Sequence, residues 1–190
     1  MRNTKGSGNA FKAFAMTDYF EFFGIKPAFL IDEAALKRQF YANSRQYHPD
    51  FYTLGSEEEQ EKVLQLSTLN NEAYKTLSDF DKRLKYLLER KGIVKEEGQN
   101  TLPQDFLMEM MEFNEALMEL EFDYDETQKK KLETQLEQIE QDLYSAIEPI
   151  LVQYDDERPD EAQLEQVLEY YLKKRYLLRI RENLNKFASA

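Results

Sequence analysis

The apolar residues of this chain recur at intervals of three and four positions over long stretches that glycine and proline rarely interrupt. The clearest series is Phe106, Met110, Phe113, Leu117 and Leu120. Such spacing places apolar groups along one side of an α-helix. Only 6 glycines and 5 prolines occur among 190 residues, and Leu, Glu, Lys and Gln are abundant. The chain is therefore expected to be all-α.

Four helices are expected in the first half, because their stretches begin with residues that cap helices or end at glycine or proline. Ser56 and Glu59 form an S-x-x-E capping box for the third helix, and the second cannot continue through Pro49. The expected bounds are Thr17 to Gly24, Asp32 to Tyr47, Ser56 to Asp79 and Phe80 to Gly92. The side chains expected to be buried on the second and third helices are Leu36, Phe40, Tyr47, Val63, Leu66, Ala73, Tyr74 and Leu77.

Three longer helical patterns fill the second half, and their short connections imply antiparallel neighbours in a bundle. Their expected bounds are a Thr101/Gln104 capping box to about Glu121, Asp125 to Tyr154 and Pro159 to Phe187. The resulting organisation is a tail or leader over 1–16, a helical hairpin with flanking short helices over 17–91, a polar linker over 92–100 and a three-helix bundle over 101–190.

Charge and residue content exclude several classes of function. With 37 acidic and 25 basic residues the net charge is −12, which disfavours a nucleic-acid partner. No apolar run approaches the ~18 residues of a membrane span, so no membrane partner is expected. The chain has no cysteine and one histidine, so no metal site is expected. It also lacks a phosphate-binding glycine loop and a serine nucleophile elbow, and we expect no cofactor and no enzymatic activity.

The first sixteen residues carry Arg2, Lys5 and Lys12 and no acidic residue. They contain neither the apolar core nor the cleavage site of a secretory signal. A disordered tail or leader is the interpretation we adopt, with an organelle-targeting presequence as the alternative. The expected location is the cytoplasm, or the mitochondrial matrix if this segment is a presequence.

The single histidine lies in the tripeptide His48-Pro49-Asp50, at the end of the second expected helix. Proline fixes its own φ and disfavours the α region for the residue before it. An imidazole and a carboxylate are therefore held on a stiff corner, which suits recognition by a partner. A hydrolase that uses His48 is an alternative, and it requires a cleft with a nucleophile beside the imidazole.

The segments around this corner resemble a J-domain, the module through which co-chaperones engage seventy-kilodalton heat-shock chaperones. "DYFEFFGI", "YHPDF" and "LNNEAYKTL" match its first helix, loop and third helix in order. With "FLMEMMEFNEALMELE" added, the stretch from 17 to about 121 resembles the HscB family of iron–sulfur cluster assembly. The resemblance implies that the chain docks on an HscA-like chaperone, stimulates its ATPase and delivers an IscU-like scaffold protein to it.

The resemblance also assigns residues to the chaperone contact. They are His48, Pro49 and Asp50 as the trigger, with Lys37, Arg38 and Arg45 as electrostatic contacts. Residues 33–47 hold these three cations against one acid, a basic patch that would steer an acidic partner surface. A solvated helix face is the alternative interpretation. Many J-domains carry a Lys-Arg pair where this chain has Tyr41 and Ala42, which indicates a specialised chaperone partner.

A second interaction surface is expected on the helix that follows Thr101. Leu107, Met111 and Met118 fall outside its core series and line a separate stripe, and methionines adapt readily to a partner. The alternative is a wide core contact that buries both stripes. The resemblance assigns the scaffold contact to Leu107, Met108, Met111, Glu112, Glu115 and Tyr176. Asn114 stands where some family members carry arginine, and a different client or self-association through the bundle is the alternative function.

Overall fold

The structure is a computed structural model, and it describes residues 18–94 and 100–186. These residues form helices and no strands, which confirms the all-α prediction. The predicted tail over 1–16 and the central part of the predicted linker lie outside the described residues. The chain divides into two compact units, residues 1–87 and 88–190, and each is considered by itself. No described helix is both long and apolar enough to cross a membrane.

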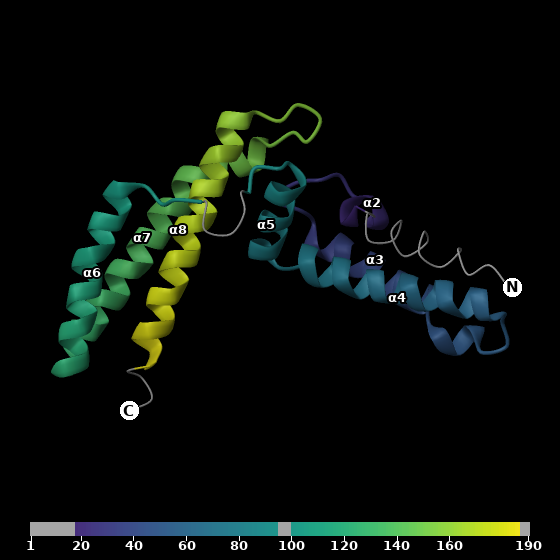
Figure 1. The fold of residues 1–190 in the computed structure, drawn as a ribbon, viewed down its shortest axis with the longest axis horizontal. Coiled ribbons are helices and arrows are strands. Elements are labelled where there is room, and N and C mark those ends of the chain that lie inside the picture. Colours follow the sequence, from purple (N-terminus) through teal and green to yellow (C-terminus); the bar gives the residue numbers. More distant parts are fainter. Residues whose placement is uncertain (1–17, 95–99, 187–190) are drawn as a thin grey trace, which may run out of the picture. The chain divides into compact units, whose positions relative to one another are not determined.

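The first unit is built around two helices that lie side by side, α3 and α4 (Figure 1). The short helix α2 begins after Asp18, whose carboxylate accepts two backbone hydrogen bonds, and ends at Gly24, where φ is 64°. That left-handed conformation favours glycine. The bounds of the elements are α2 Tyr19–Phe23, α3 Glu33–Gln46, the 3-10 helix η1 Pro49–Tyr52, α4 Glu57–Leu77 and α5 Phe80–Arg90. Ser56 caps α4 as its sequence predicts.

A polar contact and an aromatic contact hold α3 against α4. The rings of Phe40 and Tyr74 stack with 4.1 Å between centroids. Asn70 is buried on α4, and its amide donates to the carbonyl oxygen of Phe40 at 3.2 Å and to Ser44 Oγ at 3.0 Å. These bonds fix the register of the hairpin, and with it the position of the loop at its end. Four of the predicted core side chains are buried, namely Leu36, Val63, Ala73 and Leu77. The other four are half-buried, namely Phe40, Tyr47, Leu66 and Tyr74.

A buried arginine closes the other end of the hairpin. Arg83 of α5 is 2% exposed, donates to the carbonyl oxygen of Phe29 at 2.9 Å and also donates to that of Leu77. Its guanidinium lies 3.7 Å from the carboxylate of Glu33 at the start of α3. Burial lowers the pKa of Arg83, while the charges of Glu33 and Asp79 raise it. Arg83 thereby ties the beginning of α3 to the end of α4.

The second unit is the expected bundle of three long helices, α6 Gln104–Phe122, α7 Glu126–Gln153 and α8 Glu161–Lys186 (Figure 1). Asp125, the predicted start of the second long helix, caps α7. The five residues of the predicted core series on α6 are all buried, against residues of α7 and α8 that include Leu136 and Leu177. Two predicted helix starts are wrong.

The Thr101/Gln104 box does not form, and α6 starts at Gln104 after Pro103 without a side-chain cap. A helix capped by Thr101 would require helical geometry at Leu102, which the following proline disfavours. The last helix starts at Glu161 rather than at Pro159. Asp160 caps it by accepting hydrogen bonds from the backbone of Ala162 and Gln163.

A charged cluster secures the connection between α7 and α8. The carboxylate of Asp156 lies 2.7 Å from Arg90, 2.8 Å from Lys91 and 2.7 Å from the hydroxyl of Tyr154. Burial alone would raise the pKa of Asp156, but hydrogen bonds from Lys91, Arg90 and Tyr154 outweigh it and lower the pKa to about 2. Burial and the Asp156 carboxylate raise the pKa of Tyr154. The connection is therefore held by ionised Asp156.

Candidate interaction sites

The corner His48-Pro49-Asp50 starts the 3-10 helix η1 at the end of α3. His48 has φ −75° and ψ 123°, so the chain leaves the α-helix there, and Pro49 occupies the first position of η1. The backbone N–H of Asp50 donates to His48 Nδ1 at 3.3 Å. This bond uses Nδ1, so Nε2 is the ring nitrogen that can donate to a partner. The His48 and Asp50 side chains are 51% and 82% exposed, with Nδ1 and Oδ2 3.7 Å apart.

Backbone carbonyl groups anchor the loop that carries the corner. The hydroxyl of Tyr52 donates to the carbonyl oxygen of Gln46 at 3.0 Å, which closes η1 against the last turn of α3. The side-chain amide of Gln60 on α4 donates to the carbonyl oxygens of Thr53 and Gly55. The sequence predicts only a loop between the second and third helices, whereas the structure has the 3-10 helix η1 there. The bonds make it an ordered turn, so the exposed imidazole and carboxylate have little freedom to lose on binding.

The surroundings of His48 do not favour a hydrolase. Its side chain is half in solvent, and its contacts are the carboxylate of Asp50 and the ring of Phe51, whose centroid is 5.5 Å away. Phe51 and, further along, Leu54 are exposed apolar side chains that the sequence interpretation did not single out. In the described parts of the chain, no group of three or more acidic or histidine side chains could hold a metal ion.

The predicted cations of α3 share its solvent side. Leu36 and Asn43 are buried, and Arg38 and Arg45 lie nearly opposite to them at about 100° per residue. Lys37 lies on the flank, and all three cations are exposed. Arg38 is 4.0 Å from Asp32, but both side chains are well exposed, so the pair contributes little and leaves Arg38 available.

Tyr41 lies on the same side of α3, between the positions of Lys37 and Arg45 around the helix, and is also exposed. The side of α3 next to the corner therefore combines positive charge with one aromatic ring.

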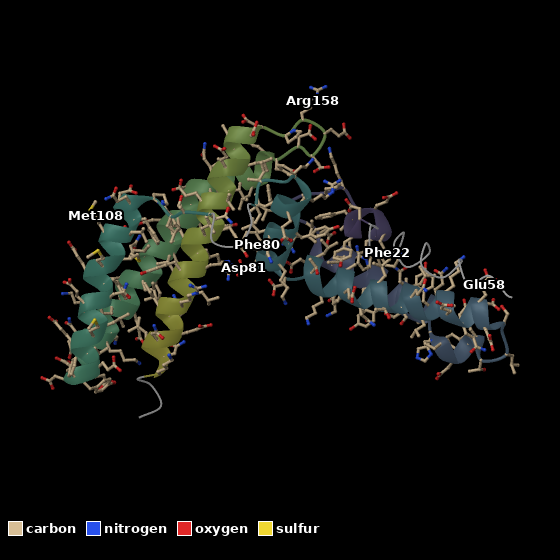
Figure 2. The ribbon with its side chains drawn as sticks, in the orientation of Figure 1. Phe22, Glu58, Phe80, Asp81, Met108 and Arg158 are labelled. Atoms are coloured by element: carbon tan, nitrogen blue, oxygen red, sulfur yellow. The ribbon has the colours of Figure 1, made fainter. Side chains whose placement is uncertain are left out.

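The second site lies on α6, where the alternative interpretation, a wide core contact that buries both stripes, is wrong. Met111 and Met118 are 60% and 59% exposed, and Leu107 and Met108 are exposed too. Figure 2 shows Met108 on the side of α6 that faces away from α7 and α8. Glu115 is also exposed and shares this outer side. The structure thus places an apolar, methionine-rich strip in solvent.

The remaining two predicted scaffold contacts flank this strip. Glu112 borders a groove of about 490 Å³ between α6 and α7. Tyr176 of α8 lies at the other flank, where its hydroxyl accepts a hydrogen bond from the amide of Asn114 at 2.9 Å. Its ring also meets that of Phe106 edge to face, at 5.7 Å between centroids. Tyr176 is half-buried and joins α8 to α6 at the edge of the strip.

Phe122, at the end of α6, was missed by the sequence interpretation and is 90% exposed. Helical spacing could have indicated its place on the exposed strip, because Phe122 follows Met118 by four residues. The predicted chaperone contacts lie in the first unit and the predicted scaffold contacts lie in the second.

Comparison with known proteins identifies both units. A profile described as DnaJ domain matches residues 18–86, and one described as HSCB C-terminal oligomerisation domain matches residues 102–185. A protein of Chromobacterium violaceum named "Co-chaperone protein HscB homolog" is 35% identical over 133 residues, covering 68% of this chain and 76% of that protein. One of the same name from Neisseria meningitidis is 32% identical over 141 residues, covering 74% and 85%.

Solved structures agree with these sequence matches. The crystal structure of human co-chaperone protein HscB is similar with a TM-score of 0.72 and 29% identity, covering 91% of this chain and 83% of that one. Chaperone HscB from Vibrio cholerae gives a TM-score of 0.68 at 25% identity, covering 91% and 98%. The chain belongs to the HscB family of co-chaperones.

Proposed function

We propose that this chain is a co-chaperone of iron–sulfur cluster assembly that brings a scaffold protein to an Hsp70-type chaperone and stimulates the ATPase of that chaperone. The observation that carries the proposal is the exposed His48-Pro49-Asp50 corner, held by backbone bonds beside the basic side of α3. Membership of a family of co-chaperones that contain a J-domain supports the same function.

The first unit would act by recognition. Lys37, Arg38 and Arg45 attract an acidic surface of the chaperone's ATPase domain over several ångströms, which speeds association and orients the hairpin. The corner then presents Nε2 of His48 and the carboxylate of Asp50 to the partner. Because the backbone that carries both groups is already fixed, more of the interaction energy is available to favour the conformation of the chaperone that hydrolyses ATP.

The second unit would hold the scaffold protein. Leu107, Met108 and Met111 offer an apolar surface, and the unbranched side chains of the two methionines can adjust to the partner. Glu112 and Glu115 border it with negative charge, which suits a partner with basic residues around an apolar patch. Delivery follows because one chain binds both proteins at once and raises their effective concentration for each other.

The test measures ATP hydrolysis by the chaperone from the same cell, with and without this chain. The wild-type protein should stimulate the rate, and His48→Gln should abolish the stimulation while helical content by circular dichroism stays unchanged. Asn71→Gln, at an exposed position of α4, is the matched control and should stimulate like the wild type. If His48→Gln stimulates as well as the wild type, the trigger assignment is wrong.

A second candidate function is that of a J-domain protein for another client, with the bundle as its dimerisation module. The description of the matched C-terminal profile as an oligomerisation domain and the exposed apolar strip of α6 favour it. Light scattering on the purified protein separates the candidates. A dimer that Met111→Asp converts to monomer, together with no binding of a scaffold protein, would support this function instead.

A further inference from the structure

The apolar strip on α6 continues beyond the residues assigned to the scaffold contact. Leu107, Met111, Met118 and Phe122 follow one another at intervals of four, seven and four residues. At about 100° per residue these positions fall within an arc of about 60° around the helix. All four side chains are exposed, and Phe122 is the most exposed of them. One apolar line therefore runs along nearly the whole of α6.

Methionine is concentrated on this helix. Four of the six methionines in the chain lie on α6, and three of these, Met108, Met111 and Met118, are exposed. Scattered exposed apolar residues are ordinary, but a continuous row on one helix side marks an interaction surface. The second half of the row, at Met118 and Phe122, is as apolar and exposed as the first half at Leu107 and Met111.

The outer border of the row is acidic, whereas the border toward α8 carries both Glu121 and a cation of α8. Glu112, Glu115 and Glu119 lie along its outer border at spacings of three and four. Like charges at these spacings weaken a helix by a few tenths of a kcal/mol for each pair, so their presence is not explained by the stability of α6. The other border is formed by α8, where the bond between Asn114 and Tyr176 fixes which side of α8 faces α6.

Arg179 supplies the positive charge on that border. It follows Tyr176 by three residues, about one turn further along α8 and within about 60° of it around the helix. Arg179 is exposed. The apolar row thus lies between an acidic border on α6 and a guanidinium on α8.

We infer that the docking surface for the scaffold protein extends over the full length of α6 to Phe122, and that Arg179 binds a carboxylate of that partner. This inference rests on the proposed function. A second copy of this chain is a poorer occupant, because two chains of net charge −12 repel each other and both bring the same acidic border. The partner segment that fits is an apolar ridge with basic residues on one side and an acidic residue on the other.

The test is a binding titration of the full-length chain with the iron–sulfur scaffold protein of the same cell. Phe122→Ala, Met118→Ala and Arg179→Glu should each weaken binding on the order of tenfold. Two matched controls should bind like the wild type: Leu178→Ala, an exposed leucine on the far side of α8, and Lys130→Glu, an exposed cation on α7. All five positions are exposed, so the fold should persist, as circular dichroism can verify.

The outcomes separate this inference from the proposed function. If Met111→Ala weakens binding while the variants at Met118, Phe122 and Arg179 bind like the wild type, the inference alone is overturned. If the wild-type chain binds no scaffold protein, the proposed function and the inference are overturned together. A wild-type dimer that Met118→Asp dissociates without any effect on scaffold binding would show that the extension serves a second copy, which also overturns the inference.

Discussion

The corner at the end of α3 and the strip along α6 present two kinds of recognition surface in one chain. The corner is small and polar, and backbone hydrogen bonds hold it in place before any partner arrives. The strip is long and apolar, and methionines that can change rotamer form much of it. A fixed surface suits a partner whose conformation has to be shifted, whereas an adaptable one suits a cargo that must be held.

In each unit an ionic side chain away from the proposed contacts joins separate segments of the fold. Arg83 ties the start of α3 to the end of α4 in the first unit, and Asp156 ties residues 90 and 91 to the connection between α7 and α8 in the second. Both lie away from the proposed contacts. Changes at these two residues should therefore destabilise one unit and leave the other in place.

The largest effect is expected from Arg83→Met, which should destabilise the first unit by about 3 kcal/mol. The carbonyl groups of Phe29 and Leu77 would lose their buried donor, while the volume at the site stays similar. Chemical denaturation followed by circular dichroism measures the change, and scaffold binding through α6 should persist. Arg38→Met, at an exposed pair, is the control and should cost less than about 0.5 kcal/mol. Equal effects of the two variants would contradict the role given to Arg83.

Asp156→Asn should cost the second unit about 2 kcal/mol at neutral pH, because the pKa of Asp156 falls from 3.8 to about 2 on folding. Its side chain is 13% exposed, so solvent screens the ion pairs little. A lowered carboxyl pKa means that this stability is present above about pH 4 and is lost as the pH falls through about 2. Urea unfolding at pH 7 and pH 3 measures it.

The control for this pH dependence is Glu157→Gln, at an exposed neighbouring position, which should change stability by less than about 0.5 kcal/mol. For Asp156→Asn the deficit relative to the wild type should shrink as the pH is lowered. A deficit that is constant between pH 7 and pH 2 would mean that the ionised carboxylate is not what holds the connection.

Pro49→Gly tests rigidity itself, since it leaves the imidazole and carboxylate in place and frees the backbone between them. We expect the concentration for half-maximal ATPase stimulation to rise on the order of tenfold, because the corner must then be ordered on binding. Scaffold binding should not change. If Pro49→Gly reaches half-maximal stimulation at the same concentration as the wild type, the backbone hydrogen bonds alone are sufficient to hold the corner and the proline adds nothing.

The smallest effect is expected from Met111→Leu, which should change the affinity for the scaffold protein less than about twofold. An adaptable apolar surface tolerates an apolar residue of similar volume, in contrast to the corner. Met111→Asp at the same position places a charge in the apolar strip and should weaken binding strongly. Calorimetric titration compares the two variants, and a large loss for Met111→Leu would contradict the adaptability of the strip.

The sequence predicted what local chemistry determines. Ser56 caps α4 as expected, α2 and α7 begin directly after Asp18 and Asp125, and Pro49 ends α3 and stiffens the corner. Helical spacing separated Met111 from the core series, but whether its side chain is buried depends on the width of the contact with α7 and α8. The Thr101/Gln104 pattern misplaces the start of α6, because Pro103 disfavours helical geometry at the residue before it.

The features that sequence reasoning missed depend on residues far apart in the chain. Arg83 reaches a carbonyl group 54 residues away, and the bond between Asn114 and Tyr176 spans 62 residues. The burial of Asn70 likewise depends on α3, where the carbonyl oxygen of Phe40 and the hydroxyl of Ser44 accept hydrogen bonds from its amide. No local pattern indicates such partners, so the sequence alone does not distinguish a buried arginine or asparagine from an exposed one on the same helix.

The most direct measurement of the central claim is ATP hydrolysis by the chaperone of the same cell, with the scaffold protein present, for the wild-type chain, His48→Gln and Met111→Asp. If the two surfaces act separately, the His48→Gln variant gives no stimulation of the ATPase yet still binds the scaffold protein. On the same assumption, the Met111→Asp variant still stimulates the ATPase through its first unit but fails to bind the scaffold protein. The account would be contradicted if His48→Gln stimulated normally, or if either substitution removed both properties in a folded protein.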